Sequence, residues 1–406
     1  MTANDPAFDF IHQREFIGYG MNSPDPHWPK GANIALSFVV NYYMGAEFSP
    51  EYGDPGSEWL FLDLPRLRPK LGGPRSDINE SMYEYGGREG VPRILNLFKK
   101  YGLKYTWNIS TQALEKAPYW ASHIVASGAE LSCASKRYID YMNVDVDSEA
   151  THIAEAVDSL QKLSGDTTLP HGWMVDRRSN ASIRLYAREH AKRGLPLLYS
   201  SDSCSDDLPY WIPSPLVADG QPDTGLLMLP FSYDTGDFRF NAYGNGWSSP
   251  KDYAEYLRDT FDVFYDEGLA GEAKMMTVVL HPHIIGRGGR LAYFEEFLQY
   301  ILSKPGVWIA RRDEIAAHWA KQFPYDPKSA FCQTKQLVTP SRRVFFSVSN
   351  QSTFVYVNFK KRFIRVSSCI ALMQDEDSRE AVKDIALSSN TPVFLPPGFP
   401  RLLDVI

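Results

Sequence analysis

The feature that most constrains the fold of this chain is an alternation of strand-like and helix-like segments through residues 34–324. Short apolar runs such as 34–41 and 274–281 alternate with segments whose apolar residues recur at helical spacing, such as 90–101. Strands separated by helices form parallel sheets, because each helix returns the chain to the edge where the next strand begins. The sequence therefore predicts an α/β fold. The predicted strands are 34–41, 103–109, 129–133, 171–175, 196–200, 226–231, 274–281 and 307–310, and the predicted helices are 90–101, 118–127, 148–164, 181–193, 252–267, 291–303 and 312–321.

Three regions of the chain differ in character. Residues 1–33 are interrupted by Pro and Gly and are predicted to be an irregular N-terminal extension. Residues 34–324 carry the alternation, with a long Gly/Pro-rich excursion at 42–88. Residues 325–406 mix β-like segments with Ser/Asn-rich and Pro-rich spans. This last region is predicted to be an appended element, a poorly ordered tail or an extension created by faulty gene prediction.

Composition excludes several classes of protein. The chain has 42 Lys and Arg against 49 Asp and Glu, a net charge of −7, and no basic block, which argues against nucleic-acid binding. The N-terminus has no apolar run, and the stretch 34–40 is too short to span a bilayer. The four cysteines lie far apart, so neither disulfides nor a zinc knuckle is expected. A cytoplasmic protein without membrane or nucleic-acid partners is predicted, and 14% aromatic residues favour a stacking or sugar-like ligand.

Chemistry in parallel α/β folds lies at the carboxyl ends of strands, which directs attention to Asn41, Asp202, His281 and Arg311. Asp202 begins a charged loop directly after a strand and is a candidate base or orienting group. Arg177 follows another predicted strand. No GxSxG, Walker or HExxH motif is present.

Two histidines, His281 and His283, close the strand 274–281. Strand alternation places both on one face, unless Pro282 ends the strand between them. We favour one functional His281 over a metal-binding pair, because no third ligand is adjacent. The Gly-rich segment that follows carries Arg287 and Arg290, and suits either an anionic or carbonyl-bearing ligand or a plain turn.

Several segments, in order along the chain, resemble the polysaccharide deacetylase (NodB-homology) superfamily. Within it they are most similar to the branch that holds the metal-independent allantoinase and cytosolic chitin-deacetylase-like proteins. The segments are Ile17–Gly20, Trp28–Ala32, Phe38–Tyr42 with Gly45–Glu47, Tyr83–Gly86 with Arg88, Arg137–Tyr141, Gly172–Trp173 with Arg177, Tyr199–Trp211, and Leu280–Arg290.

The resemblance implies a distorted (β/α)7 barrel and hydrolysis of an amide C–N bond in a small-molecule substrate. It assigns His281 as the catalytic acid, and we predict Asp202 as the partner of His281. In metal-using relatives an Asp and two His hold a divalent cation. Members of this branch self-associate, so a homo-oligomer is expected. The residues predicted to bind substrate are Arg177, Arg287, Glu47, Tyr85, Arg88 and Trp173.

The chain departs from the family pattern at three positions. Ala134 stands where a His is expected, and Tyr43 and Met44 replace two Glu residues. An alanine methyl neither ligates a metal nor moves a proton, so no metal site and no cofactor are predicted. Three hypotheses follow: an allantoinase-type hydrolase of cyclic amides, a catalytically impaired paralogue that binds without turnover, and a chitin or peptidoglycan N-deacetylase, which would require export.

Overall fold

The computed structural model describes residue 10, residues 15–21, 23–63, 75–241 and 246–328, and the backbone of three short strands between 346 and 365. The chain divides into two compact units, Met1–Leu337 and Val338–Ile406. The described part of the second unit is a three-stranded antiparallel sheet of β10 (Phe346–Ser349), β11 (Ser352–Tyr356) and β12 (Phe363–Arg365). Apart from residues 325–328 and these three strands, the prediction made for residues 325–406 falls outside the described residues.

The first unit is built on one sheet in the order β6-β7-β5-β4-β3-β2-β1-β8, with β9 also paired to β1. All pairs are parallel except β6 with β7. This arrangement confirms the predicted α/β class and the distorted (β/α) barrel. The strands are β1 (Ile34–Tyr42), β2 (Thr106–Ser110), β3 (Glu130–Ser135), β4 (Gly172–Trp173), β5 (Tyr199–Ser200), β6 (Tyr210–Ile212), β7 (Leu226–Met228), β8 (Lys274–Leu280) and β9 (Val307–Ile309).

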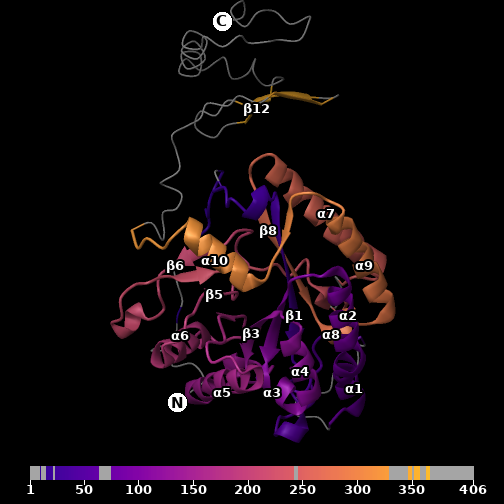
Figure 1. The fold of residues 1–406 in the computed structure, drawn as a ribbon, viewed down its shortest axis with the longest axis vertical. Helices are drawn as coiled ribbons and strands as arrows, with labels where there is room; N and C mark the ends of the chain where they lie inside the picture. Colours follow the sequence, from indigo (N-terminus) through magenta and orange to yellow (C-terminus); the bar gives the residue numbers. More distant parts are fainter. Residues whose placement is uncertain are drawn as a thin grey trace, which may run out of the picture. The chain divides into compact units, whose positions relative to one another are not determined.

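The helices of this unit lie around the outside of the strands (Figure 1). Every residue of β1 is buried, because helices cover its outer side and barrel side chains cover its inner side. The helices are α1 (Asp77–Tyr85), α2 (Val91–Tyr101), α3 (Thr111–Lys116), α4 (Pro118–Ala126), α5 (Val146–Ser164), α6 (Ser182–Arg193), α7 (Pro250–Leu269), α8 (Pro282–Ile285), α9 (Gly288–Leu302) and α10 (Arg312–Gln322). None of the described helices is long and apolar enough to cross a membrane.

Helix α1 lies inside the segment that the sequence pattern predicted to be an excursion. It continues through a π-helical turn, Gly86–Gly90, directly into α2. Close packing requires glycine at two positions of this turn, because a Cβ on Gly90 would lie 2.1 Å from the Pro282 carbonyl oxygen and a Cβ on Gly86 would lie 2.9 Å from His283. Glycines that usually mark a loop therefore serve helix packing here.

The side chain of Arg312 joins the two ends of the strand order. Arg312 is 1% exposed. Its guanidinium donates to Thr277 Oγ1 on β8 at 3.0 Å, and to the carbonyl oxygens of Leu229 and Pro230, which follow β7. Its Nε donates to Ser201 Oγ at 2.9 Å, just beyond β5. Arg312 thus closes the barrel where the strands themselves are not neighbours in the sheet.

Candidate functional site

The centre of the candidate site is a buried pair, His281 and Asp237. His281 is the first residue after β8, and Asp237 begins the short 3-10 helix η6 (Asp237–Asn241). His281 Nδ1 lies 2.6 Å from Asp237 Oδ1, and the His281 backbone N–H donates to Asp237 Oδ2 at 2.7 Å. The exposed fractions are 2% and 0%. The carboxylate only accepts, so Nδ1 carries the proton and Nε2 is left as an acceptor.

An amide chain fixes the other side of the His281 ring. Asn41, near the end of β1, places its Nδ2 3.0 Å from His281 Nε2. Asn108, on the neighbouring strand β2, donates to Asn41 Oδ1 at 2.9 Å and to the Met174 carbonyl at 3.0 Å. Ser132 Oγ donates to Asn108 Oδ1 at 3.0 Å. Three adjacent strands therefore hold the imidazole so that Nε2 accepts, which is the state of a general base.

The predicted pairing of His281 with Asp202 is wrong. Asp202 accepts instead from the Val175 backbone N–H at 2.6 Å and from the Tyr186 hydroxyl at 3.2 Å. Burial raises the pKa of Asp202 to about 6. The sequence does carry a signal for Asp237, because it follows the strand at 226–231 in a short loop with a second Asp.

A cavity of about 10 Å³, the size of one water molecule, lies beside the amide chain and is lined by Asn41 and Asn108. The Tyr43 ring borders it and stacks on Tyr138 with centroids 3.9 Å apart and planes at 7°. Its centroid is 5.6 Å from that of His281. Within the described part of the chain, the Tyr43 hydroxyl and Nε of Arg137 are both buried without a hydrogen-bond partner. These two groups could bind a water molecule in this cavity.

Arg177, a predicted substrate-binding residue, lines the same cavity. Its Nη1 lies 2.6 Å from Glu58 Oε2, and its guanidinium lies over the rings of Phe48 and Tyr138 at 5.1 and 5.3 Å. The Arg177 side chain is therefore held in one position, and a ligand bound in this cavity would share the Arg177 guanidinium with Glu58.

The structure places the other predicted binding residues elsewhere. Arg287 lies over the Tyr85 ring at 3.6 Å and pairs with Asp63 at 3.4 Å. Glu47 and Arg88 line a separate, open cleft. None of these four candidates, and neither Trp173 nor Asp202, lines the cavity beside Asn41.

Trp173 is fully buried and stacks on Tyr186 at 4.9 Å. Its Nε1 donates to His190 Nε2 at 2.8 Å, while His190 Nδ1 lies 3.0 Å from the Pro196 carbonyl oxygen. Both ring nitrogens of His190 therefore make hydrogen bonds while the ring is neutral. Trp173 packs in the core rather than against a ligand.

Burial lowers the pKa of His190 to about 4, which predicts a loss of stability on acidification. Between about pH 6.5 and 4 the unfolded chain binds a proton at this site that the folded chain does not. The free energy of unfolding should therefore fall by up to about 1.4 kcal/mol per pH unit from this group. Urea titrations at several pH values should show this slope reduced in His190→Gln but not in His123→Gln, since His123 is exposed. Equal slopes in all three proteins would refute the assignment.

The family resemblance implies a divalent cation in metal-using members, and the donors described here do not fit one. Among the described residues, no group of three or more His, Cys, Asp or Glu side chains is placed to hold a metal ion. Met44 follows Tyr43 at the end of β1, and Ala134 lines the cavity beside Asn41. A thioether and a methyl group do not ligate hard divalent cations. We therefore derive no step through a metal.

Comparison with known proteins agrees with this fold. Residues 76–189 match the family model described as polysaccharide deacetylase. A protein of Schizosaccharomyces pombe named putative polysaccharide deacetylase is 40% identical over 302 residues, which cover 73% of this chain and 93% of that protein. The crystal structure of PuuE allantoinase is 39% identical with a TM-score of 0.71, and the match covers 78% of this chain and 100% of that one.

A crystal structure of a probable polysaccharide deacetylase from Pseudomonas aeruginosa PAO1 is 38% identical, with a TM-score of 0.70 and the same coverage. The S. pombe relative is matched over nearly its whole length at high identity. This chain therefore belongs to the polysaccharide deacetylase family of hydrolases.

Proposed function

We propose that the protein hydrolyses a C–N bond of a small cyclic amide without a metal, with allantoin as its substrate. The observation that carries the proposal is the buried His281–Asp237 pair, whose remaining ring nitrogen accepts from Asn41, a residue that lines a water-sized cavity. The similarity to PuuE allantoinase supports the choice of a cyclic ureide.

The proposed reaction uses groups of this chain only. The Asn41 amide first turns away from His281 Nε2, which frees the lone pair of this nitrogen. A water that is hydrogen-bonded by the Tyr43 hydroxyl then gives a proton to Nε2 as its oxygen bonds to the ring carbonyl carbon. Asp237 stabilises the imidazolium that forms. The tetrahedral intermediate then breaks its C–N bond, and His281 returns the proton to the departing nitrogen. The product is an open-chain carboxylic acid, which releases the second proton of the water to solvent and becomes a carboxylate.

Access to His281 requires movement of a side chain. Tyr43 and His281 are each about 2% exposed, and the cavity holds one water. A substrate therefore reaches Nε2 after the Tyr43 ring leaves its stack on Tyr138. This step favours a small substrate over a polymer chain.

The direct test of substrate class is a comparison of purified protein on allantoin and on N-acetylglucosamine oligomers. Ring opening of allantoin, followed by the appearance of the carboxylate product, is the expected result. Release of acetate from the oligomers without turnover of allantoin would instead establish an N-deacetylase.

A second candidate function is a non-catalytic relative that binds a ligand. The observation that favours it is the Tyr43 ring, which occupies the space in front of His281. In that case folded wild-type protein turns over neither substrate.

Two substitutions of Tyr43 separate these functions. Tyr43→Phe keeps the stacked ring and removes the unpartnered hydroxyl, so it should lower the turnover number for allantoin about tenfold with little change in KM. Tyr43→Gly removes the ring and serves as the comparison. An unchanged Tyr43→Phe with a faster Tyr43→Gly would show that the ring only blocks the site. Allantoin binding by Tyr43→Gly, with no turnover by any of the three proteins, would support the non-catalytic relative.

A further inference from the structure

The proposed hydrolysis releases one proton in a buried place. The attacking water supplies two protons, of which one ends on the departing nitrogen and the other on the carboxylic acid product. His281 and Tyr43 are each about 2% exposed, and the cavity beside Asn41 has room for one water molecule. A proton crosses a protein interior along hydrogen-bonded groups, because an isolated buried charge is costly. The reaction therefore needs a chain of such groups from the cavity to solvent.

One wall of the cavity holds a tyrosine whose hydroxyl has several partners. Tyr141 lines the cavity, is 1% exposed and begins the short 3-10 helix η4 (Tyr141–Asn143). Its hydroxyl oxygen accepts from Ser135 Oγ at 2.9 Å and from the Arg137 backbone N–H at 3.4 Å. Its own hydrogen has two acceptors within reach, His152 Nδ1 at 3.2 Å and the Arg137 carbonyl oxygen at 3.4 Å. With both lone pairs engaged, the hydroxyl donates to the nearer acceptor, His152.

The backbone at Ser135 is strained in a way that fixes this hydrogen bond. Ser135 ends β3 with a φ of +111°, a conformation that residues other than glycine rarely adopt. The residue is 1% exposed, and its hydroxyl is the donor that contacts Tyr141. Strain of this kind persists where the position of a group matters more than local stability. Ser135 therefore directs the Tyr141 hydrogen toward His152.

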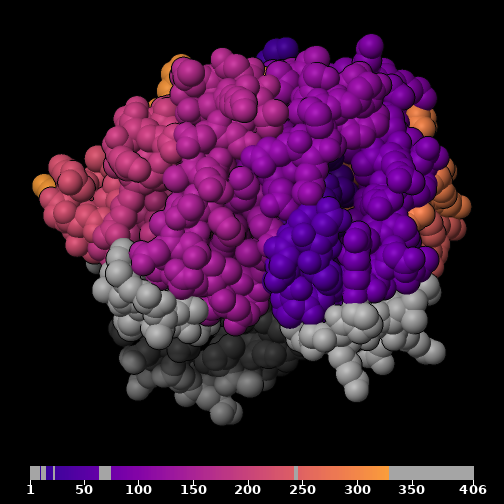
Figure 2. All heavy atoms as spheres, turned by 90° about the horizontal axis from the view of Figure 1, so that it is seen from below, coloured from indigo at the N-terminus to yellow at the C-terminus, as the bar shows by residue number. Residues whose placement is uncertain are grey.

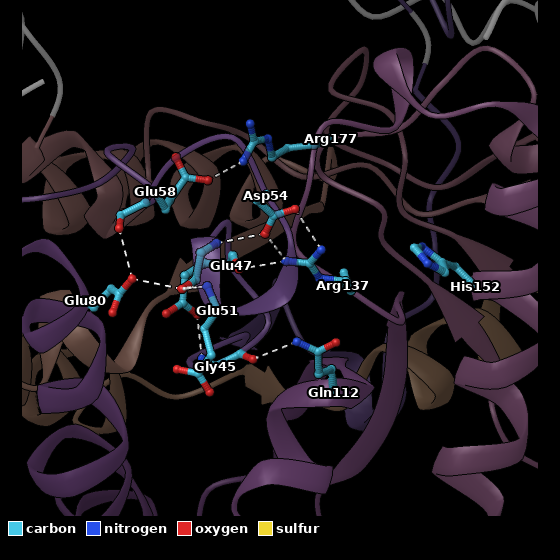
Figure 3. A network of polar contacts seen from close by, with 12 residues as sticks. Gly45, Glu47, Glu51, Asp54, Glu58, Glu80, Gln112, Arg137, His152 and Arg177 are labelled. Atoms are coloured by element: carbon cyan, nitrogen blue, oxygen red, sulfur yellow. Dashed lines mark hydrogen bonds and ion pairs between the residues drawn. The ribbon is translucent and has the colours of Figure 1, made fainter. Parts of the chain in front are cut away.

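His152 connects the Tyr141 hydroxyl to the surface. It lies on α5 and is partly exposed, and its ring meets the Tyr141 ring edge to face with centroids 5.9 Å apart. Figure 3 shows the His152 ring pointing toward Arg137. Helix α5 lies low in Figure 1 and forms part of the surface seen from below in Figure 2. The hydrogen-bonded chain therefore runs from the cavity to solvent in two steps.

The surroundings of His152 keep its ring mostly neutral near pH 7. Burial lowers the pKa of His152, and Glu155 opposes this shift. Arg137 and Lys136 also lower the pKa, and Asp145 raises it. The neutral ring accepts the Tyr141 hydrogen at Nδ1 and carries its own proton on Nε2.

We propose that Tyr141 and His152 relay the second proton of the water from the cavity to solvent. The O–H bond of the acid breaks as the Tyr141 oxygen takes the proton, and the hydroxyl gives its own proton to His152 Nδ1. The imidazolium then loses its Nε2 proton to solvent, and proton exchange with solvent restores the starting tautomer. Burial raises the pKa of the Tyr141 hydroxyl, which favours this exchange over ionisation of the tyrosine. The relay rests on the proposed hydrolysis, which releases the proton.

The test measures allantoin ring opening by the full chain at pH 7 in dilute buffer. His152→Gln should lower the turnover number at least about fivefold, since no group then carries the proton outward. Its KM should stay within about twofold of wild type, because substrate does not contact His152. Added imidazole, a small proton carrier, should restore most of the turnover of His152→Gln and should leave His281→Gln inactive. His123→Gln, which replaces an exposed histidine on α4, should keep the wild-type rate.

Ser135→Gly gives a second test in a variant that should fold well. Glycine adopts a φ of +111° without strain, so this protein should be at least as stable as wild type in thermal unfolding. It should nevertheless open the ring at least about threefold more slowly, because the Tyr141 hydrogen is no longer directed toward His152. A wild-type rate in stable Ser135→Gly would count against the relay.

The outcomes separate the relay from the hydrolysis itself. Equal turnover by wild type and His152→Gln in dilute buffer would overturn the relay and leave the hydrolysis in place. A slow His152→Gln that imidazole does not restore would also overturn it, because the histidine would then have only a structural part. Folded wild-type protein that opens no ring would overturn both proposals.

Discussion

Replacing Asp237 with Asn should lower the turnover of allantoin by at least about a hundredfold while the protein remains folded. Asp237 accepts two hydrogen bonds from His281, one from Nδ1 and one from the backbone N–H. An Asn side chain has only one acceptor atom, so one of the two N–H groups must face an amide donor. The imidazole then loses its fixed tautomer and the charge that stabilises its protonated form. His281→Gln should be at least as severe, because no group then moves the proton.

The matched control lies in the same loop. Asp234→Asn removes a carboxylate that bonds Tyr256 at 2.7 Å and does not contact His281, so turnover should stay within about threefold of wild type. Circular dichroism and thermal unfolding establish that each variant is folded. An Asp237→Asn protein with half or more of the wild-type rate would contradict the proposed role of this pair.

Replacing Arg312 with Met should destabilise the protein by about 3 kcal/mol or more, measured as the free energy of unfolding in urea. The guanidinium is buried and satisfies two hydroxyl groups, of Ser201 and Thr277, and two carbonyl oxygens beyond β7. Removing the donor leaves buried acceptors without partners, at a cost of about 1–3 kcal/mol each before the site relaxes. The barrel would also lose its link between β8 and the strands at the other end of the sheet.

The neighbouring residue provides the control for this prediction. Arg311 directly precedes α10, is about one-third exposed and pairs with Asp313 at 2.9 Å. Arg311→Met should cost less than about 1 kcal/mol. Similar losses in Arg311→Met and Arg312→Met would show that Arg312 has no special part in closing the barrel.

The hydrophobic alternation predicted the parallel sheet well, because each long helix and each buried strand leaves its own period in the sequence. The strands β4 and β5, two residues each, were predicted as five-residue runs, since neighbouring apolar residues are buried without sheet pairing. Helix α1 was missed because the glycines after it resemble a loop. Their close packing against α8 is a tertiary contact that no local pattern reports.

Single residues of the candidate site were predictable from the sequence, but the pairing of His281 with Asp237 was not. His281 and Asn41 were found from their places at strand ends, where parallel folds concentrate chemistry. The partner of His281 lies 44 residues away in a loop whose path no periodicity determines. Glu47, Arg88, Arg287 and Tyr85 were grouped with His281 through family resemblance, and the structure places them in other contacts.

The proposed role of His281 in C–N hydrolysis without a metal is tested by removing metal ions from the protein. The rate of allantoin ring opening is measured on protein dialysed against a chelator, before and after Zn²⁺ is restored, with His281→Gln in parallel. Equal rates with and without Zn²⁺ are expected for the wild type, and no measurable rate is expected for the variant. Activity that disappears on chelation and returns with Zn²⁺, or folded wild-type protein that never opens the ring, would contradict this role.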